Sequence, residues 1–271
     1  MLRKIVLGMG AAGVSLAMLP LLAAFEAHVV NVTARIENAL SVPVDPIAFG
    51  TVFPQEQLER RLPVQLSQSF LDENRVDDVE YIIRQKPKCG VTTDDGTVGP
   101  IGPTWTGHVI PTLDDPTTTE VDESRGGTAY TIDCEVDKPA EVTAPGPYLL
   151  PSLCEYISKH PDNQPENDGS LNSFHQPFVV SNGQVDWNDV AGRLAKSDND
   201  TSDLWTIDLK VPCFGGYCAQ DWADFVHGIN PDANPDLYTQ DINNEHKVFG
   251  CNLWLEVTGV SETPSQPTEP I

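Results

Sequence analysis

Hydrophobic and polar residues alternate in three stretches near the start of the chain, and each stretch predicts a β-strand. The central stretch spans residues 62–70, and similar patterns cover residues 30–36 and 79–83. A two-residue period places the apolar side chains on one face of a strand. In the central stretch these apolar residues are Leu62, Val64, Leu66 and Phe70.

The segment that joins the first two strands, residues 41–59, is rich in residues that oppose a helix. It contains Pro43, Pro46, Gly50 and Pro54. Proline fixes its own φ angle and has no backbone N–H to donate, so it is confined to edge strands and bends. The segment therefore predicts an edge strand or a bend between two sheets.

The second half of the chain continues the strand pattern. Alternation predicts strands at 130–136 and 251–257, and the polar loop within residues 190–211 predicts a hairpin of two strands. Short helices are predicted at 153–157 and 222–226, where apolar residues share a face.

About seven to nine strands without helical crossovers predict an all-β fold, a two-sheet sandwich with jelly-roll or Greek-key connections. Residues 90–188 are rich in loops and prolines, and we expect them to form a long insertion with short helices. The expected organisation is a signal peptide at 1–27, one β-sandwich domain at 28–260 and a disordered tail at 261–271.

The N-terminus has the pattern of a secretory signal. Arg3 and Lys4 precede an uncharged run over residues 5–25. The run is also long enough to span a bilayer, so an uncleaved anchor is the alternative, and the leader is the expected membrane contact. We expect an extracellular protein, either secreted or held at the cell surface.

Acidic residues outnumber basic ones by 40 to 16, which gives a formal net charge of −24. Such a surface repels the phosphate backbone of nucleic acids, so we expect no nucleic-acid partner. Net charge bears on solubility and association and leaves the fold open.

Six cysteines form an even set behind an export signal, which predicts disulfide bonds. Fifteen pairings are possible. Cys213 and Cys218 bracket a short glycine-bearing loop, and Cys134 and Cys154 could close another loop. A zinc site is the alternative, although the chain has no C-x-x-C pair. The disulfide candidates are Cys89, Cys134, Cys154, Cys213, Cys218 and Cys251.

Histidine spacing gives little support to a zinc hydrolase, in which H-E-x-x-H presents two ligands on one helix face. No two histidines are four residues apart, and no G-x-S-x-G elbow occurs. We therefore name no catalytic residue, no cofactor and no metal ligand, and favour a protein that is not an enzyme. The histidines are His28, His108, His160, His175, His227 and His246.

The order of the strand motifs resembles the TasA/camelysin family of secreted bacterial proteins. The resemblance covers roughly residues 28–86 and 188–260, and rests on VVNVTARIEN, FGTVFPQEQLERRLPVQLSQSF, VEYIIRQ, DLWTIDLKV and CNLWLEVTGV. It implies a jelly-roll protein of the cell surface or extracellular matrix. Such a protein is expected in biofilms, in association with components of the matrix and the cell envelope. Camelysin-type members also raise the alternative of a secreted metallopeptidase.

Several members of that family assemble into fibres by donating an N-terminal strand to the next subunit. Here the strand at residues 29–37 is expected either to complete its own sheet or to be donated, since a free end can add to another sheet. The donation candidates are Val30, Val32, Ala34 and Ile36. A surface module that binds glycans or another partner is a further alternative, with Trp254 as its best aromatic candidate.

Overall fold

The structure is a computed structural model that describes residues 35–43, 45–92, 97–99, 106–111, 130–134, 148–162 and 169–262. Its contacts divide the chain into two units, Met1–Ile36 and Glu37–Ile271. The fold below is that of the second unit. The predicted signal peptide and tail residues 263–271 lie outside the described residues, whereas Ser261 and Glu262 belong to the last strand.

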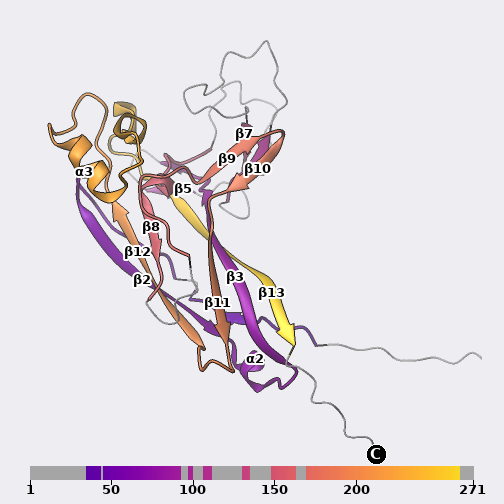
Figure 1. Cartoon of the computed structure of the whole chain (residues 1–271). Helices are drawn as coiled ribbons and strands as arrows, with labels where there is room; N and C mark the ends of the chain where they lie inside the picture. Colours follow the sequence, from indigo (N-terminus) through magenta and orange to yellow (C-terminus); the bar gives the residue numbers. More distant parts are fainter. Residues whose placement is uncertain are drawn as a thin grey trace, which may run out of the picture. The chain divides into compact units, whose positions relative to one another are not determined.

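One sheet has four antiparallel strands in the order β1-β2-β12-β8 (Figure 1). The strands are β1 (Leu40–Ser41), β2 (Gln57–Leu66), β12 (Ser202–Lys210) and β8 (Ile157–His160). β12 is a central strand, and its Trp205 and Thr206 pair with Leu62 of β2 and His160 of β8. β8 lies within residues 90–188, so part of that segment belongs to this sheet.

The second sheet has three antiparallel strands in the order β11-β3-β13. The strands are β11 (Val190–Ala195), β3 (Val76–Pro87) and β13 (Cys251–Glu262). At the centre of the sheet, Tyr81 pairs with Gly192 on one side and with Val257 on the other. Register shifts interrupt the β13 pairing after Val257 and after Val260.

Three two-stranded sheets and several short helices complete the described part. The pairs are β4 (Val91–Thr92) with β5 (Val98–Gly99), β6 (His108–Pro111) with β7 (Tyr130–Asp133), and β9 (Phe178–Ser181) with β10 (Gln184–Trp187). The α-helices are α2 (Gln68–Asp72) and α3 (Trp222–Ile229). The 3-10 helices are η2 (Cys154–Tyr156), η3 (Pro235–Tyr238) and η4 (Ile242–Asn244).

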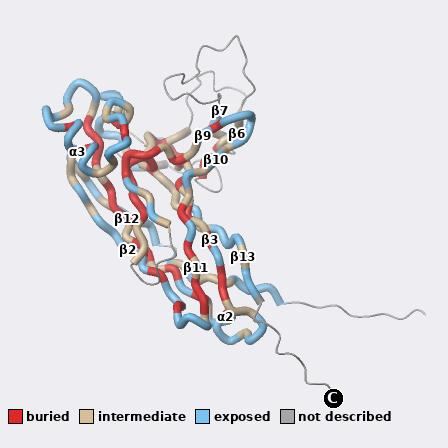
Figure 2. The backbone as a smooth tube through the Cα atoms, viewed as in Figure 1, coloured by how far each residue is buried: buried red, intermediate tan, exposed pale blue. Residues whose placement is uncertain are grey.

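A single hydrophobic core draws side chains from both principal sheets. Its fully buried members include Val64, Tyr81, Ile83, Trp205 and Ile207, and Figure 2 shows the buried stretches in red. Fully burying such an apolar side chain contributes roughly 1.5–3 kcal/mol. The described residues thus confirm an all-β protein in which strands from distant parts of the sequence share one core.

Tyr81 and Trp205 make the central contact between the two principal sheets. Their rings pack edge to face with centroids 6.4 Å apart. Trp205 donates its indole N–H to the Tyr81 hydroxyl at 2.7 Å, and that hydroxyl donates to Asp203. The aromatic pair therefore fills the core and also satisfies its own polar atoms, as buried Tyr and Trp require.

Most predicted elements are confirmed with different bounds. The strands expected near 79–83 and 251–257 lie within β3 and β13, and the strand expected at 205–211 is part of β12, which ends one residue earlier at Lys210. The helix expected at 222–226 is α3. The strand expected at 130–136 is β7 as far as Asp133; Cys134 is not in a strand, and residues 135 and 136 are not described. The helix expected at 153–157 is shorter, because η2 ends at Tyr156 and Ile157 opens β8.

The predicted strand at 62–70 is wrong at its C-terminal end. β2 stops at Leu66, and Phe70 lies in α2. Ser67 ends the strand because its hydroxyl accepts a hydrogen bond from the Phe70 N–H at 3.1 Å, which caps the helix. Phe70 is still buried, so its apolar character matched the strand phase by coincidence.

The predicted hairpin at 190–211 is also wrong. β11 pairs with β3 and β12 pairs with β2 and β8, so the two strands enter different sheets. Only the Ala195–Asp200 bridge joins the ends of the turn between them. The inward faces of β11 and β12 meet across the core, where Leu194 and Trp205 are both fully buried.

Replacement of Gly192 by alanine should destabilise the fold. A methyl group at Gly192 would overlap the Tyr81 ring, and overpacking of a filled core typically costs about 1–3 kcal/mol. The control is Gly228→Ala in α3, where the added methyl would meet nothing within 4 Å and helix propensity favours alanine by roughly 0.5–1 kcal/mol. In urea, the unfolding midpoint of Gly192→Ala should fall below that of the wild type, and the midpoint of Gly228→Ala should rise above it. Equal changes in the two midpoints would contradict this packing.

Candidate functional site

All six cysteines are disulfide-bonded, as predicted. The pairs are Cys89–Cys134, Cys154–Cys251 and Cys213–Cys218. The expected Cys213–Cys218 bridge is confirmed, whereas the suggested Cys134–Cys154 pairing is wrong. Cys134 follows β7 and lies beside Cys89, just beyond the end of β3, with their Cα atoms 5.8 Å apart. The pairing depends on strand placement, which spacing along the chain does not reveal.

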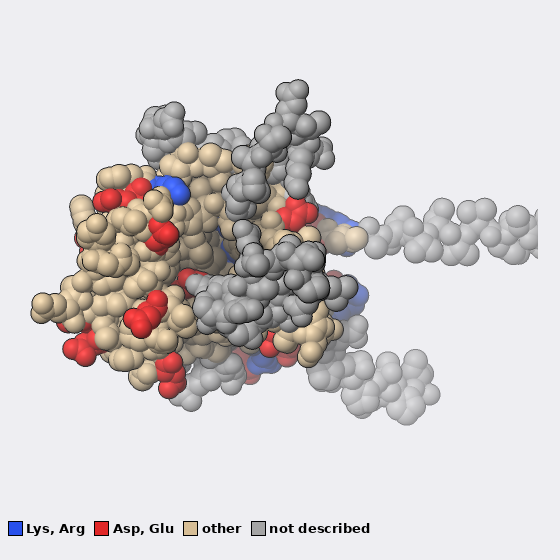
Figure 3. All heavy atoms as spheres, turned by 90° about the horizontal axis from the view of Figure 1, so that it is seen from above, with Lys and Arg blue, Asp and Glu red and all other residues tan. Residues whose placement is uncertain are grey.

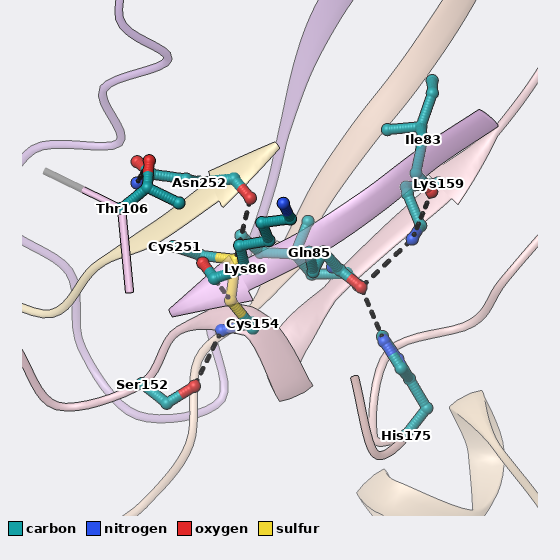
Figure 4. Close-up of a disulfide and its surroundings, with 11 residues drawn as sticks. Ile83, Gln85, Lys86, Thr106, Ser152, Cys154, Lys159, His175, Cys251 and Asn252 are labelled. Carbon is teal, nitrogen blue, oxygen red and sulfur yellow. Dashed lines mark hydrogen bonds between the residues drawn. A yellow bond between two sulfur atoms is a disulfide. The ribbon is translucent and has the colours of Figure 1, made fainter. Parts of the chain in front are cut away.

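The Cys154–Cys251 disulfide ties the two principal sheets together at one end (Figure 4). Cys154 lies in η2, just before β8 of the four-stranded sheet, and Cys251 opens β13 of the other sheet. Backbone hydrogen bonds reinforce the link, since Leu153 N–H donates to Gly250 O and Gly250 N–H donates to Pro151 O, each at 3.0 Å.

Next to this disulfide lies a buried polar cluster formed by Gln85, Lys159 and His175 (Figure 4). Gln85 and Lys159 are fully buried, and His175 is 6% exposed. The Gln85 side-chain oxygen accepts from Lys159 Nζ at 3.2 Å and lies 2.7 Å from His175 Nε2, which donates to it in the tautomer protonated at that nitrogen. Gln85 belongs to β3 and Lys159 to β8, so the cluster crosses from one sheet to the other.

Backbone oxygens hold the three side chains in place. Gln85 Nε2 donates to Ile157 O at 2.9 Å, which directs the amide oxygen toward Lys159 and His175. Lys159 Nζ also donates to Ile83 O at 3.2 Å. Buried polar groups of this kind are stable only when each has its partner, so the cluster has a fixed geometry.

Burial controls the protonation of both basic groups. It lowers the pKa of Lys159 to about 7, an effect that the charge of Asp189 partly offsets. Burial and the charge of Lys159 lower the pKa of His175 to about 4, against the raising effect of the Asn172 carbonyl 2.7 Å from Nδ1. Because burial is the largest effect on each group, Lys159 exchanges its proton near neutral pH and His175 is neutral there.

Of the three residues in this cluster, only Gln85 has a signal in the sequence. Gln85 continues the inward phase of Val79, Tyr81 and Ile83, and this phase is the signal that could have placed a polar residue in the core. Lys159 and His175 lie in segments without a clear period. Lys159 is buried where β8 pairs with β12, and His175 lies in the loop between β8 and β9.

The outer edge of β13 is open in the part of the chain that the structure describes, since β13 pairs only with β3. Along this strand Trp254, Val257 and Val260 are 39%, 40% and 48% exposed. Lys86 Nζ lies 3.7 Å from the Trp254 ring centroid, a cation–π contact that covers one face of the indole.

Charged side chains occur on other long strands as well as on β13, which carries the exposed Glu256. On β11, Arg193 forms ion pairs with Asp78 at 3.0 Å and with Asp198 at 3.2 Å. On β2, which β1 covers only at Gln65 and Leu66, the side chains of Glu59, Arg60 and Arg61 are exposed. Charged side chains at an edge oppose pairing with another chain, so β13 is distinguished by its length of 12 residues and by its exposed Trp254, Val257 and Val260 and not by a lack of charge.

Acidic side chains dominate the end of the molecule that carries α3, where red atoms are scattered over the face in Figure 3. The segment from Asp221 to Lys247 has six exposed carboxylates and one lysine. Among the residues with described coordinates, no group of three or more His, Cys, Asp or Glu side chains could hold a metal ion. In that same part of the chain no helix is long and apolar enough to cross a membrane.

The predicted strand-donation residues fall almost entirely outside the described chain. Val30, Val32 and Ala34 are not described, and Ile36 is 94% exposed. Arg35, Ile36 and Glu37 are not in a strand. The donation of this segment therefore stays a prediction.

Loss of the Cys154–Cys251 bridge should cost more stability than loss of Cys213–Cys218. The first bridge spans 97 residues and the second spans 5. From loop-closure entropy, loss of the first bridge should lower the free energy of unfolding by about 4.7 kcal/mol and loss of the second by about 2 kcal/mol. Urea unfolding of the two paired Cys→Ser variants measures the difference, and an equal loss would contradict the prediction.

The free energy of unfolding should rise as pH rises from about 4 to 6.5, in part because of His175. Its pKa is about 4 in the folded state against 6.5 for the free group, so the unfolded chain binds more protons in this window. One pKa unit corresponds to about 1.4 kcal/mol. Over this pH range the free energy of unfolding of His175→Gln should therefore rise by up to about 3 kcal/mol less than that of the wild type. Exposed His227→Gln is the control, and an unchanged slope in His175→Gln would refute the assignment.

No protein-family model, no curated protein and no solved structure matches this chain.

Proposed function

We propose that this chain is an exported structural protein of the cell surface or extracellular matrix, which assembles into fibres by β-strand addition. The open edge of β13 is the observation that carries the proposal. This strand has 12 residues, contains no proline or lysine, and carries the charged residues Glu256 and Glu262. It exposes apolar side chains and, among the described strands, pairs only with β3. Such an edge is a template for another strand.

The donor strand of the proposal is the segment 29–37 of a neighbouring copy. Val30, Val32, Ala34 and Ile36 alternate with polar residues, so one face of this segment is apolar. Ile36 is almost fully exposed on its own chain. Each larger side chain buried on a partner would contribute roughly 1.5–3 kcal/mol, which favours docking over a free segment.

Three disulfides and a shared core support the remaining parts of the proposal. Disulfides persist in oxidising compartments, which is consistent with export by the predicted leader. The two principal sheets would form the layers of a jelly-roll sandwich, because both contribute to one core. The resemblance to the TasA/camelysin family agrees with such a fold and with assembly by strand donation.

Electron microscopy of the processed, secreted protein tests the proposal with two matched variants. Val257→Asp places a charge on the β13 edge, and Val179→Asp places one at a similarly exposed valine of β9; their exposures are 40% and 43%. The wild type and Val179→Asp should form fibres, whereas Val257→Asp should remain a folded monomer, because burying a carboxylate between paired strands is costly.

Two results would reject the proposal. One is a wild-type protein that stays monomeric at high concentration after removal of the leader. The other is fibre formation by Val257→Asp at the wild-type rate, which would show that the β13 edge is not the acceptor. Circular dichroism of each variant establishes that the monomer is folded.

A further inference from the structure

The amine of Lys159 lies close enough to the side-chain amide of Gln85 for the two groups to react with each other. Nζ lies 3.2 Å from Gln85 Oε1 and 3.2 Å from Ile83 O. The amide carbon is about 1.2 Å from its oxygen, so it lies within about 4.4 Å of the amine. A neutral amine has two N–H groups, which these two oxygens accept, and its lone pair takes part in neither bond.

The surroundings keep that amine reactive. Lys159 is fully buried, and no ion pair of Lys159 occurs among the described residues. Burial disfavours the ammonium form and brings the pKa of Lys159 to about 7. A desolvated neutral lysine is a nucleophile, as in enzymes that form covalent lysine intermediates.

The amide of Gln85 is polarised at its oxygen. His175 Nε2 lies 2.7 Å from Oε1, and Nδ1 lies 2.7 Å from Asn172 O. A neutral imidazole has a single N–H, and the tautomer protonated at Nε2 directs it at Oε1. A donor aimed at this oxygen stabilises the negative charge that develops when the amide carbon is attacked. Ile157 O holds the leaving nitrogen, Gln85 Nε2, at 2.9 Å.

We propose that Lys159 and Gln85 form an intramolecular isopeptide bond. The Lys159 Nζ lone pair attacks Gln85 Cδ, and the electron pair of the C=O bond moves to Oε1, where His175 donates a hydrogen bond. The intermediate collapses, the Cδ–Nε2 bond breaks, and Nε2 leaves as ammonia with one proton from Nζ. The products are a secondary amide and ammonia, so no oxidant or cofactor is needed.

The bond would join β8 to β3 and therefore one principal sheet to the other. It lies beside the Cys154–Cys251 disulfide, which links the same two sheets (Figure 4). Unlike the disulfide, the amide would persist under reducing conditions. This inference concerns the folded monomer and is independent of fibre assembly.

Mass spectrometry of the reduced, denatured wild-type protein tests the inference. The intact mass should be lower than the sequence mass by one ammonia. A glutamate-specific protease should release a joined pair of peptides, one that begins at Tyr81 and one that spans Tyr156–Glu166. This protease keeps Gln85 inside its peptide, so cyclisation of an N-terminal glutamine cannot mimic the loss of ammonia.

Lys159→Met removes the amine and should restore the full mass, whether or not the variant folds. Lys86→Met is the matched control, because Lys86 Nζ lies over the Trp254 ring and should leave the ammonia loss unchanged. His175→Phe should slow formation of the bond during refolding of the denatured, newly made chain. A wild-type protein with its full sequence mass, or an ammonia loss that persists in Lys159→Met, would overturn the proposal.

Discussion

The contact between Tyr81 and Trp205 sets how the two principal sheets face each other. Each residue is fully buried on an inner strand of its sheet, and the indole N–H donates to the phenol oxygen. Close approach at this point requires Gly192, since any side chain there would occupy the space of the Tyr81 ring. The apolar rows of β2, β3 and β12 then meet over a single core.

The periodic parts of the fold could be predicted from the sequence. A period of two identifies which side chains of a strand face inward, and it located β3, β12 and β13. Trp222, Phe225 and Val226 likewise share one face of α3. These elements were recognisable because the core selects apolar residues on one face, whatever the partner strand is.

Partner choice could not be predicted in the same way. β11 and β12 have the pattern of a hairpin, yet they enter different sheets, because periodicity gives the face of a strand and not its neighbour. The disulfide of Cys134 with Cys89 depends on that same tertiary placement. Lys159 is the hardest case, since a lysine is expected at the surface and only the burial of β8 makes it an interior amine.

The links between the sheets are distributed unevenly. The Cys154–Cys251 disulfide and the contact of Lys159 with Gln85 lie together at one end. Near α2, hydrogen bonds from Lys196 Nζ to Phe70 O at 3.2 Å and to Glu73 O at 2.6 Å connect the loop after β11 to the segment before β3. At the α2 end the polypeptide itself joins the two sheets, because residues 67–75 lead from β2 into β3 and residues 196–201 lead from β11 into β12. A tensile load across the two sheets would therefore be carried by the backbone near α2 and by the Cys154–Cys251 bond at the other end. Reduction of the disulfide would weaken that other end and leave the α2 end tethered.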